Sequence, residues 1–343
     1  RNVTGVQTCA LPIWPRCMSR KLKVGIAGYG VVGRRRREFI DQHPAFCTIA
    51  VCDRALDERA DLLGGVRPYT HYEKMLASEQ FDALFVCLPN DLAAQVTIAG
   101  LEKGLHVFCE KPPGRDLKDI CDVIACERRH PRQRLKYGFN HRYHDSVRDA
   151  LAVVRTQRLG EVINLRGVYG KSAIINFESD WRTKRAIAGG GILLDQGIHM
   201  VDLLRLFAGD FESVHAVVSN GHWKHNVEDN VYATLRTASG VVAMLHSSAT
   251  QWRHRFNLEI ALTKGSLILS GILSGSKSYG AETLTVVTAS EHDRGDPREE
   301  TVRYNQDNSW RDEIADFAEA VLADRPVIDG SSAEALKDRK STR

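Results

Sequence analysis

The sequence lacks long apolar runs and clustered metal ligands. No stretch approaches the roughly 18 consecutive apolar residues that a membrane-spanning helix needs. The cysteines form no C-x-x-C pair and no cysteine–histidine cluster, which excludes the common zinc sites and a disulfide scaffold. We therefore expect a cytoplasmic protein with a reduced set of thiols, no membrane partner and no bound metal.

The two ends of the chain are not typical of a folded domain. Codons can be written for Asp338–Arg343 whose reverse complement translates as Thr8–Ile13. Two ends of one gene have no reason to mirror each other, and the string is similar to an adapter used in short-read DNA sequencing. We therefore expect residues 1–17 to be an adapter or assembly scar with a leader, and 338–343 to be a second scar. Met18 is then the expected natural start, and the native C-terminus is expected to be truncated.

An excess of charge of one sign is also absent. The formal net charge is +4, and it drops to +1 once Arg1 and Asp338–Arg343 are left out. This balance gives no electrostatic footprint for nucleic acid, so we expect no such partner. The one dense basic run, Arg34–Arg37, is interpreted as the solvated face of a helix.

The first half of the chain alternates short apolar runs with helical patterns. Short runs rich in Val, Ile, Leu and Phe are typical of strands that are buried on both faces of a parallel sheet. The alternation predicts a Rossmann domain, a doubly wound parallel α/β sheet, over residues 18–142. Its predicted strands are 23–27, 48–52, 83–87, 106–109 and 135–139, and its predicted helices are 31–41, 91–103 and 117–128.

The second half reads as successive strands punctuated by glycines, which suggests antiparallel hairpins. It predicts an α+β domain with a large, mostly antiparallel sheet over residues 143–337. The predicted strands are 162–169, 213–219, 231–237, 241–246, 257–262, 266–270 and 283–287, with helices at 195–207 and 311–323.

A glycine fingerprint joins the first predicted strand to the first helix. It consists of Gly28, Tyr29, Gly30, Val31, Val32 and Gly33. In this context the glycines permit a tight turn, a close approach to a pyrophosphate and helix–strand packing. Asp53 follows at the end of the second strand, where it would bind the ribose hydroxyls of the cofactor. Its charge favours NAD, while the adjacent Arg54 keeps NADP open.

Three further segments carry a family resemblance. They are Cys109-Glu110-Lys111-Pro112, Gly138–Tyr143 (G-F-N-H-R-Y), and Gly189–Asp202, which contains G-G-G-x-L-x-D-x-G-x-H. With the fingerprint, they resemble the Gfo/Idh/MocA family of glucose–fructose oxidoreductase and inositol 2-dehydrogenase. The resemblance implies an NAD(P)-dependent dehydrogenase that acts on a sugar-like alcohol.

The candidate catalytic residues are Lys111, Asp195 and His199. Removing a hydride from a carbinol requires a group that takes the hydroxyl proton, and histidine titrates near neutral pH. Asp195 lies four residues before His199, so on a helix it would share its face and orient the ring or bind the substrate. Lys111 follows a parallel strand at its carboxyl end, where it would stabilise a developing alkoxide. The resemblance assigns these same roles.

Other candidates depend mainly on the resemblance. Cofactor contacts are expected from Leu88, Pro89, Asn90 and Glu110, although the family often has histidine at the position of Ala93. Substrate contacts are expected from Asn140, Arg142, Trp181 and Arg182, with pairing to a core acid as the alternative for Arg142.

Two other functions stay open at this stage. Some relatives hold NAD permanently and cleave glycosides by transient oxidation of the sugar, and a regulator that senses NAD would use the same scaffold. The resemblance also implies a homo-oligomer, a dimer or tetramer, that pairs through the antiparallel sheet.

Overall fold

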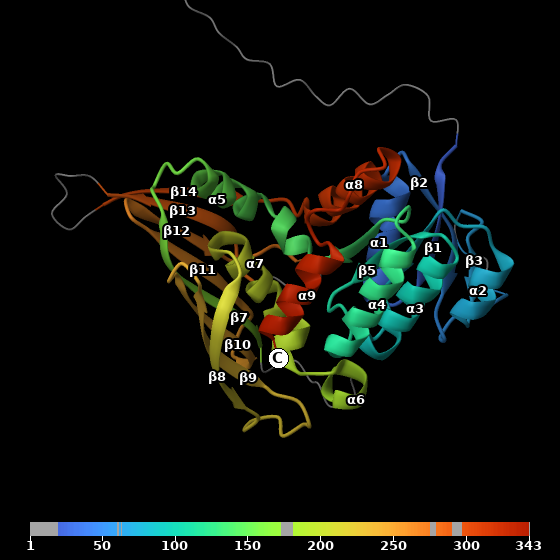
Figure 1. Ribbon diagram of the computed structural model, residues 1–343, viewed down its shortest axis with the longest axis horizontal. Helices are drawn as coiled ribbons and strands as arrows, with labels where there is room; N and C mark the ends of the chain where they lie inside the picture. Colours follow the sequence, from blue (N-terminus) through green and yellow to red (C-terminus); the bar gives the residue numbers. More distant parts are fainter. Residues whose placement is uncertain are drawn as a thin grey trace, which may run out of the picture.

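The computed structural model shows that the chain forms two β-sheets, one in each half of the molecule (Figure 1). The structure describes residues 20–59, 62, 64–172, 181–274, 279–289 and 297–342. The proposed start at Met18 and the expected scar at 1–17 lie outside these residues. No helix within the described ranges is long and apolar enough to cross a membrane.

The first sheet is parallel and six-stranded, with the order β3-β2-β1-β4-β5-β6, so the predicted doubly wound sheet is confirmed. The order reverses between β1 and β4, and a crevice forms at the carboxyl ends of strands at such a point. The strands are β1 (Leu22–Ala27), β2 (Phe46–Cys52), β3 (Arg67–Tyr69), β4 (Ala83–Val86), β5 (His106–Glu110) and β6 (Leu135–Gly138). The helices are α1 (Val31–Gln42), α2 (Tyr72–Ser78), α3 (Asn90–Glu102) and α4 (Leu117–Arg129).

The second sheet has eight strands in the order β14-β13-β12-β11-β7-β10-β9-β8, and its only parallel pair is β7–β10. The expected mostly antiparallel sheet is therefore confirmed. Its strands are β7 (Val162–Ser172), β8 (Phe211–Ser219), β9 (Asn230–Thr237), β10 (Val242–Gln251), β11 (Arg255–Leu262), β12 (Gly265–Ser270), β13 (Glu282–Thr288) and β14 (Arg298–Tyr304).

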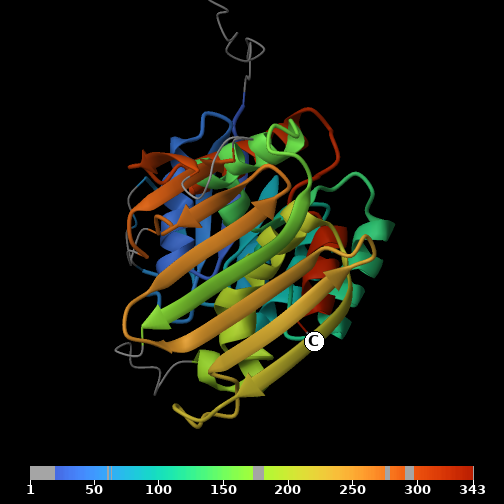
Figure 2. The same ribbon diagram turned by 90° about the vertical axis from the view of Figure 1, so that its left-hand side faces the viewer.

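Helices cover one face of the second sheet only. The longer ones are α5 (Asp145–Arg155) and α7 (Ile198–Ala208), and short turns are η1 (Asn140–Tyr143), η2 (Trp181–Thr183), α6 (Arg185–Ala188) and η3 (Leu193–Gly197). A cluster of buried side chains, including Leu165, Leu204 and Leu258, fills the space between α5, α7 and the sheet. The opposite face of the sheet points toward the viewer in Figure 2, and no described helix lies in front of it.

The chain returns to the first sheet near its end. Helix α8 (Ser309–Leu322) was predicted as part of the second domain, but Phe317 packs against Phe46, Phe85 and Phe108 of the first sheet. The physical reason is an apolar stripe on α8 that completes the core beneath β1, β2, β4 and β5.

A final helix, α9 (Ser332–Ser341), runs through most of the expected scar at 338–343. It contacts α4 and α7. The side chain of Asp338 is buried and forms an ion pair with Arg205. These positions are thus part of a packed helix, while the proposal that they derive from an adapter concerns their origin.

The interpretation of Arg34–Arg37 as a solvated face is wrong for Arg36, which is fully buried. Its guanidinium pairs with Glu110 (2.6 Å) and Glu313 (2.7 Å) and lies 4.4 Å from the ring centre of Phe108. Two carboxylates and an aromatic face offset the cost of burying this charge. The pair fastens α1 and α8 to the end of β5.

Candidate active site

The glycine fingerprint forms an open cradle at the start of α1. Gly28 has a φ of +93°, and a Cβ there would lie 2.3 Å from the carbonyl oxygen of Cys87. A Cβ at Gly33 would lie 1.9 Å from the carbonyl oxygen of Gly28, whereas nothing lies within 4 Å of one at Gly30. Gly30 also precedes α1 without a side-chain cap, so the first N–H groups of the helix face open space. These residues fit the pyrophosphate of a dinucleotide.

The second part of the cofactor edge lies beside this cradle. Asp53 follows β2, and its Oδ2 accepts a hydrogen bond from the backbone N–H of Tyr29 at 3.0 Å. Asp53, Arg54, Leu88 and Pro89 line one pocket. A carboxylate and a guanidinium at its rim suit the ribose and the adenine side of a cofactor. Val31 and Val32 start α1, and Val31 is exposed.

Lys111 reaches from the end of β5 to the second domain. Its Nζ donates a hydrogen bond to the backbone carbonyl oxygen of Asp195 at 2.6 Å and lies 3.9 Å from the Oδ1 of that residue. Burial lowers the pKa of Lys111, and the carboxylate of Asp195 only partly offsets this effect. Because Lys111 directly follows β5, its ammonium group lies at the carboxyl edge of the parallel sheet.

Asp195 is held by cations from two further segments. Its Oδ2 lies 2.5 Å from the Nζ of Lys171 at the end of β7, and its Oδ1 lies 3.3 Å from the Nε of Arg182. Burial raises the pKa of Asp195, but Lys171, Arg182 and Lys111 outweigh it and hold that pKa well below the usual value. Lys171 was missed in the sequence, since no motif surrounds it and only the pairing of β7 brings it here.

His199 lies in the first turn of α7 and is buried. Burial and then the charge of Lys111 lower its pKa well below the ordinary value, so the ring is neutral at pH 7. The edge of Phe139 approaches the ring with centroids 6.1 Å apart. Lys111 of the first half and Asp195 and His199 of the second half thus lie in one region between the two sheets.

Asp195 and His199 lie in two kinds of helical turn. Residues Leu193–Gly197 form a π-helical turn, and α7 begins only at Ile198. Of the two roles expected for Asp195, orienting the ring is the one for which the described residues provide no contact. The carboxylate of Asp195 is bound by Lys171 and Arg182, and no hydrogen bond joins it to His199 among the described residues. Asp195 therefore organises the cations of the site instead of orienting the imidazole.

Several other candidates have structural contacts. Glu110 binds Arg36, so this carboxylate fastens the end of β5. Asn90 donates a hydrogen bond from Nδ2 to the carbonyl oxygen of Ala188 at 2.7 Å, which ties α3 to α6. Asn140 is buried and binds Ser309.

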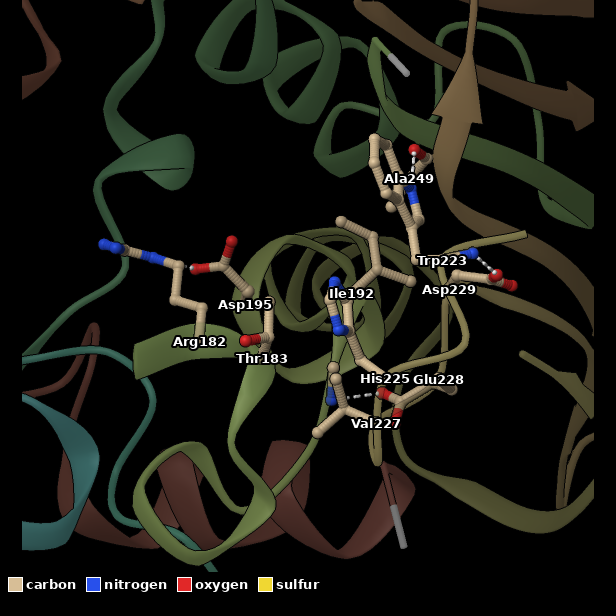
Figure 3. Close-up of a pocket in the computed structure, with 11 residues that line it drawn as sticks. Arg182, Thr183, Ile192, Asp195, Trp223, His225, Val227, Glu228, Asp229 and Ala249 are labelled. Atoms are coloured by element: carbon tan, nitrogen blue, oxygen red, sulfur yellow. Dashed lines mark hydrogen bonds and ion pairs between the residues drawn. The ribbon is translucent and has the colours of Figure 1, made fainter. Parts of the chain in front are cut away.

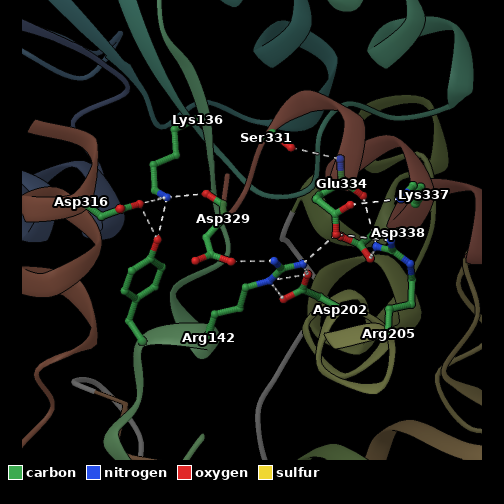
Figure 4. Close-up of polar contacts among 11 residues, drawn as sticks. Lys136, Arg142, Asp202, Arg205, Asp316, Asp329, Ser331, Glu334, Lys337 and Asp338 are labelled. Atoms are coloured by element: carbon green, nitrogen blue, oxygen red, sulfur yellow. Dashed lines mark hydrogen bonds and ion pairs between the residues drawn. The ribbon is translucent and has the colours of Figure 1, made fainter. Parts of the chain in front are cut away.

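Arg142, expected among substrate contacts, pairs with the buried Asp202 and with the more exposed Asp329. Its Nε lies 2.9 Å from both carboxylate oxygens of Asp202, and its NH1 lies 3.0 Å from Asp329 (Figure 4). Because Asp202 is fully buried, the guanidinium compensates a charge inside the protein. The alternative interpretation, a structural ion pair, is the correct one.

Arg182 and Asp195 line one wall of a pocket (Figure 3). The opposite side carries Trp223 and His225, with Ile192 between them. The guanidinium of Arg182 also stacks on Trp181, 4.5 Å from the ring centre. Arg182 therefore lines this pocket and Trp181 packs against it, while their expected contact with substrate stays a prediction. No group of three or more His, Cys, Asp or Glu side chains in the described ranges is arranged to hold a metal ion.

The two domains of the fold each match a model of one oxidoreductase family. Residues 22–139 match the profile of an oxidoreductase family with an NAD-binding Rossmann fold, and residues 147–268 match the GFO/IDH/MocA C-terminal domain. The chain belongs to the GFO/IDH/MocA family, as its motifs suggested.

Relatives of known name are sugar and polyol enzymes. The 1,5-anhydro-D-fructose reductase of Ensifer adhaerens is 32% identical over 63% of this chain, an alignment that spans 64% of that relative, slightly less than two thirds. The D-glucoside 3-dehydrogenase of Escherichia coli is 28% identical over 67% of this chain and 71% of its own length.

Solved structures share the fold over nearly the whole chain. The myo-inositol 2-dehydrogenase from Lactobacillus plantarum has a TM-score of 0.76 at 26% identity, covering 94% of this chain and 95% of that one. A levoglucosan dehydrogenase in complex with NADH has a TM-score of 0.78 at 21% identity, covering 93% and 94%.

Proposed function

We propose that this chain transfers a hydride between NAD(P) and the carbon of a secondary hydroxyl in a sugar, nucleotide sugar or cyclic polyol. The observation that carries the proposal is the meeting of Lys111, Asp195 and His199 beside a cofactor cradle. The names of the relatives, which are sugar and inositol dehydrogenases and a sugar reductase, support the substrate class.

The side chains divide the work on the hydroxyl group. When bound, the nicotinamide supplies the hydride acceptor. His199, neutral because of its burial, accepts the hydroxyl proton as the carbon loses its hydride. Lys111 donates a hydrogen bond to the oxygen that gains negative charge. The backbone carbonyl of Asp195 accepts a hydrogen bond from Lys111, and its carboxylate holds Lys171 and Arg182 at the edge of the pocket.

The position of Asp53 favours NAD over NADP. Its carboxylate is anchored by the N–H of Tyr29, so it cannot easily turn away from a ribose bound at the rim of β2. A 2′-phosphate there would be repelled by this charge. Arg54 is exposed beside it, which leaves NADP compatible as a weaker cofactor.

The test is a spectrophotometric assay of the purified full chain with NAD and a panel of sugars, glycosides and inositols. We expect NADH absorbance to rise with at least one of them, and to vanish in Lys111→Ala and His199→Ala. Product formation without accumulation of NADH would favour the glycoside hydrolase instead. Binding of NAD with no turnover of any substrate would favour the regulator, for which no comparison gives support.

We also propose that the chain forms a cytoplasmic homo-oligomer through the open face of the second sheet. Val217, Tyr232 and His246 lie side by side across β8, β9 and β10 on this face. Val217 is 68% exposed, and Met244 on the same face is 53% exposed. Together these side chains form an apolar strip of the kind that marks interfaces. The six described cysteines are all unpaired, in keeping with a reducing compartment.

Sedimentation of the full chain tests the assembly. Val217→Glu places a charge at the β8 end of the strip, on its most exposed apolar side chain, and should shift the species toward monomer. Val302→Glu, which changes an equally apolar exposed residue on β14 outside this strip, is the matched control. A wild-type monomer at micromolar concentration would overturn the proposed oligomer.

A further inference from the structure

Two imidazole rings lie face to face beneath the proposed site of hydride transfer. The ring centroids of His141 and His199 are 3.8 Å apart, and their planes differ by 13°. Both side chains are buried, with 5% and 4% of their surface exposed. His141 comes from η1, after the first sheet, and His199 comes from α7 on the second. The stack therefore joins the two halves of the molecule at the proposed base.

His199 lacks the hydrogen bond that usually orients a histidine base. Such a base is commonly held by a carboxylate or carbonyl that accepts from its second ring nitrogen. Here the Nδ1 of His199 is buried and has no hydrogen-bond partner among the described residues. Its ring orientation must then come from packing. The flat contact with His141 is the closest of the aromatic contacts that serve this purpose, since the rings of Phe139 and Tyr169 lie 6.1 Å and 6.4 Å from that of His199.

His141, by contrast, is fixed by hydrogen bonds on both nitrogens. The hydroxyl of Ser309 donates to Asp307 at 2.6 Å, so its oxygen accepts from the Nδ2 of Asn140 at 3.0 Å. The Oδ1 of Asn140 therefore faces the Nδ1 of His141, at 3.2 Å, and this nitrogen must carry a proton. The Nε2 of His141 then accepts from the hydroxyl of Tyr169 at 3.0 Å.

Burial holds the pKa of His141 well below its ordinary value, so the ring is neutral, and this chain of donors and acceptors fixes it in one tautomer and one orientation. It cannot rotate without losing two hydrogen bonds inside the protein, where unpaired polar groups are costly. A ring that is fixed in this way offers a rigid surface to the ring stacked upon it.

We propose that His141 is a positioning residue, which holds the imidazole of His199 at the angle required to accept the substrate proton. The inference rests on the proposed function, since it concerns the base of that reaction. It assigns His141 no contact with substrate or cofactor. It also gives Asn140, expected to touch substrate or cofactor, a place in the support of the base instead.

The charged and titratable groups around His199 come from every neighbouring element. They are Lys111 after β5, Asp195 in η3, Arg36 in α1, His144 before α5, Tyr169 in β7 and His141 itself. Burial is the first cause that lowers the pKa of His199. Removing the ring of His141 would admit water to the face of His199, so this pKa should rise toward its ordinary value.

The experiment compares His141→Ala with His141→Phe in the full chain, using the substrate found in the panel assay. His141→Ala should lower kcat about 10- to 100-fold, since a misplaced reacting group costs rate on this scale. The KM for NAD should stay unchanged, and the acid limb of kcat against pH should move upward. His141→Phe keeps the flat ring without its hydrogen bonds, and should recover much of kcat and the original limb.

His130→Ala, at the end of α4 and remote from the site, is the matched control. NAD binding measured by fluorescence quenching shows whether each variant is folded. If His141→Ala is folded and retains both kcat and the acid limb, the positioning role is wrong. If His141→Ala does not fold, His141→Phe provides the test. A folded His141→Phe that loses kcat while the acid limb of its pH profile stays in place contradicts the role. Retained activity in His199→Ala would instead overturn the proposed base, and with it the proposed chemistry.

Discussion

Two clusters of charged side chains include residues of η3 or of α7, and they differ in what surrounds them. The site cluster consists of Lys111, Lys171, Arg182 and Asp195, and it borders a pocket. The core cluster consists of Arg142, Asp202, Arg205, Glu334 and Asp338, and it is packed beneath α9 (Figure 4). In the first, several cations converge on one carboxylate. In the second, each guanidinium faces several carboxylates.

The site cluster therefore serves the proposed chemistry, whereas the core cluster holds the fold together. The core cluster joins α7 and α9 to η1, and two of its carboxylates have no exposed surface. Such groups are costly to separate because each would be left as a buried charge. The site cluster stays at the edge of solvent, where its charges can act on a ligand. Substitutions in the two regions should therefore change different measured quantities.

The largest expected effect is on turnover. His199→Ala should lower kcat by roughly 10²–10⁴-fold, because the base is lost. Its melting temperature should stay close to that of the wild type, since the Nδ1 of His199 makes no hydrogen bond among the described residues. Steady-state kinetics and calorimetry on one preparation check both points. If His199→Ala unfolded at a much lower temperature, the contrast between a site that controls turnover and a core cluster that controls stability would be lost.

The next effect should fall on stability. Arg142→Met leaves Asp202 buried without its bidentate partner, which should cost about 3–5 kcal/mol in the free energy of unfolding. The double variant Arg142→Met with Asp202→Leu should recover part of this loss, because no charge is then stranded. Denaturant titration measures both. Loss of stability as large in the double variant as in the single one would show that the charge pair is not the cause.

A smaller effect is expected at the cofactor edge. Asp53→Ala should raise the KM for NAD about 10-fold, equivalent to roughly 1.4 kcal/mol, because the ribose loses an anchored acceptor. The kcat at saturating NAD should change little, and the preference for NAD over NADP should narrow. Initial rates with both cofactors test this. An unchanged KM for NAD would contradict the placement of the cofactor along β2.

The smallest effect concerns pH. A proton acceptor must be neutral, and burial lowers the pKa of His199 in the folded protein. Oxidation should therefore persist as the pH falls through 6.5, the ordinary value for histidine, and decline only below it. A profile of kcat/KM from pH 5 to 8 measures the limb. A decline centred above 6.5 would show that the ring is more hydrated than its burial indicates.

Local patterns predicted the features that depend on neighbouring residues. The fingerprint from Gly28 to Gly33, the strand that ends in Lys111 and most strands of both sheets were found because apolar periodicity and turn glycines are local. Strands β3 and β14 were missed: β3 has three residues, and β14 (R-E-E-T-V-R-Y) is almost wholly exposed and charged. Helix α5 was missed because it follows η1 directly and begins with charged residues, so no clear boundary marks its start.

Features that depend on distant contacts could not be predicted. The burial of Arg36 depends on Glu313, far along the chain, and the role of Lys171 depends on strand pairing. The helix predicted over 195–207 did not distinguish the π turn at Leu193–Gly197 from α7, which begins at Ile198. The stack of His141 on His199 likewise needs both sheets in place.

Helix α9 has a consequence for how the two halves stay in register. It contacts α4 and β6 on the first half and α7 on the second, and α7 bears His199. Separation of the halves during exchange of the dinucleotide would require α9 to release one of these neighbours. Helix α9 thus links the two halves next to the region in which the reaction is proposed to occur. Shortening this helix should blunt turnover even though it supplies no group to the chemistry.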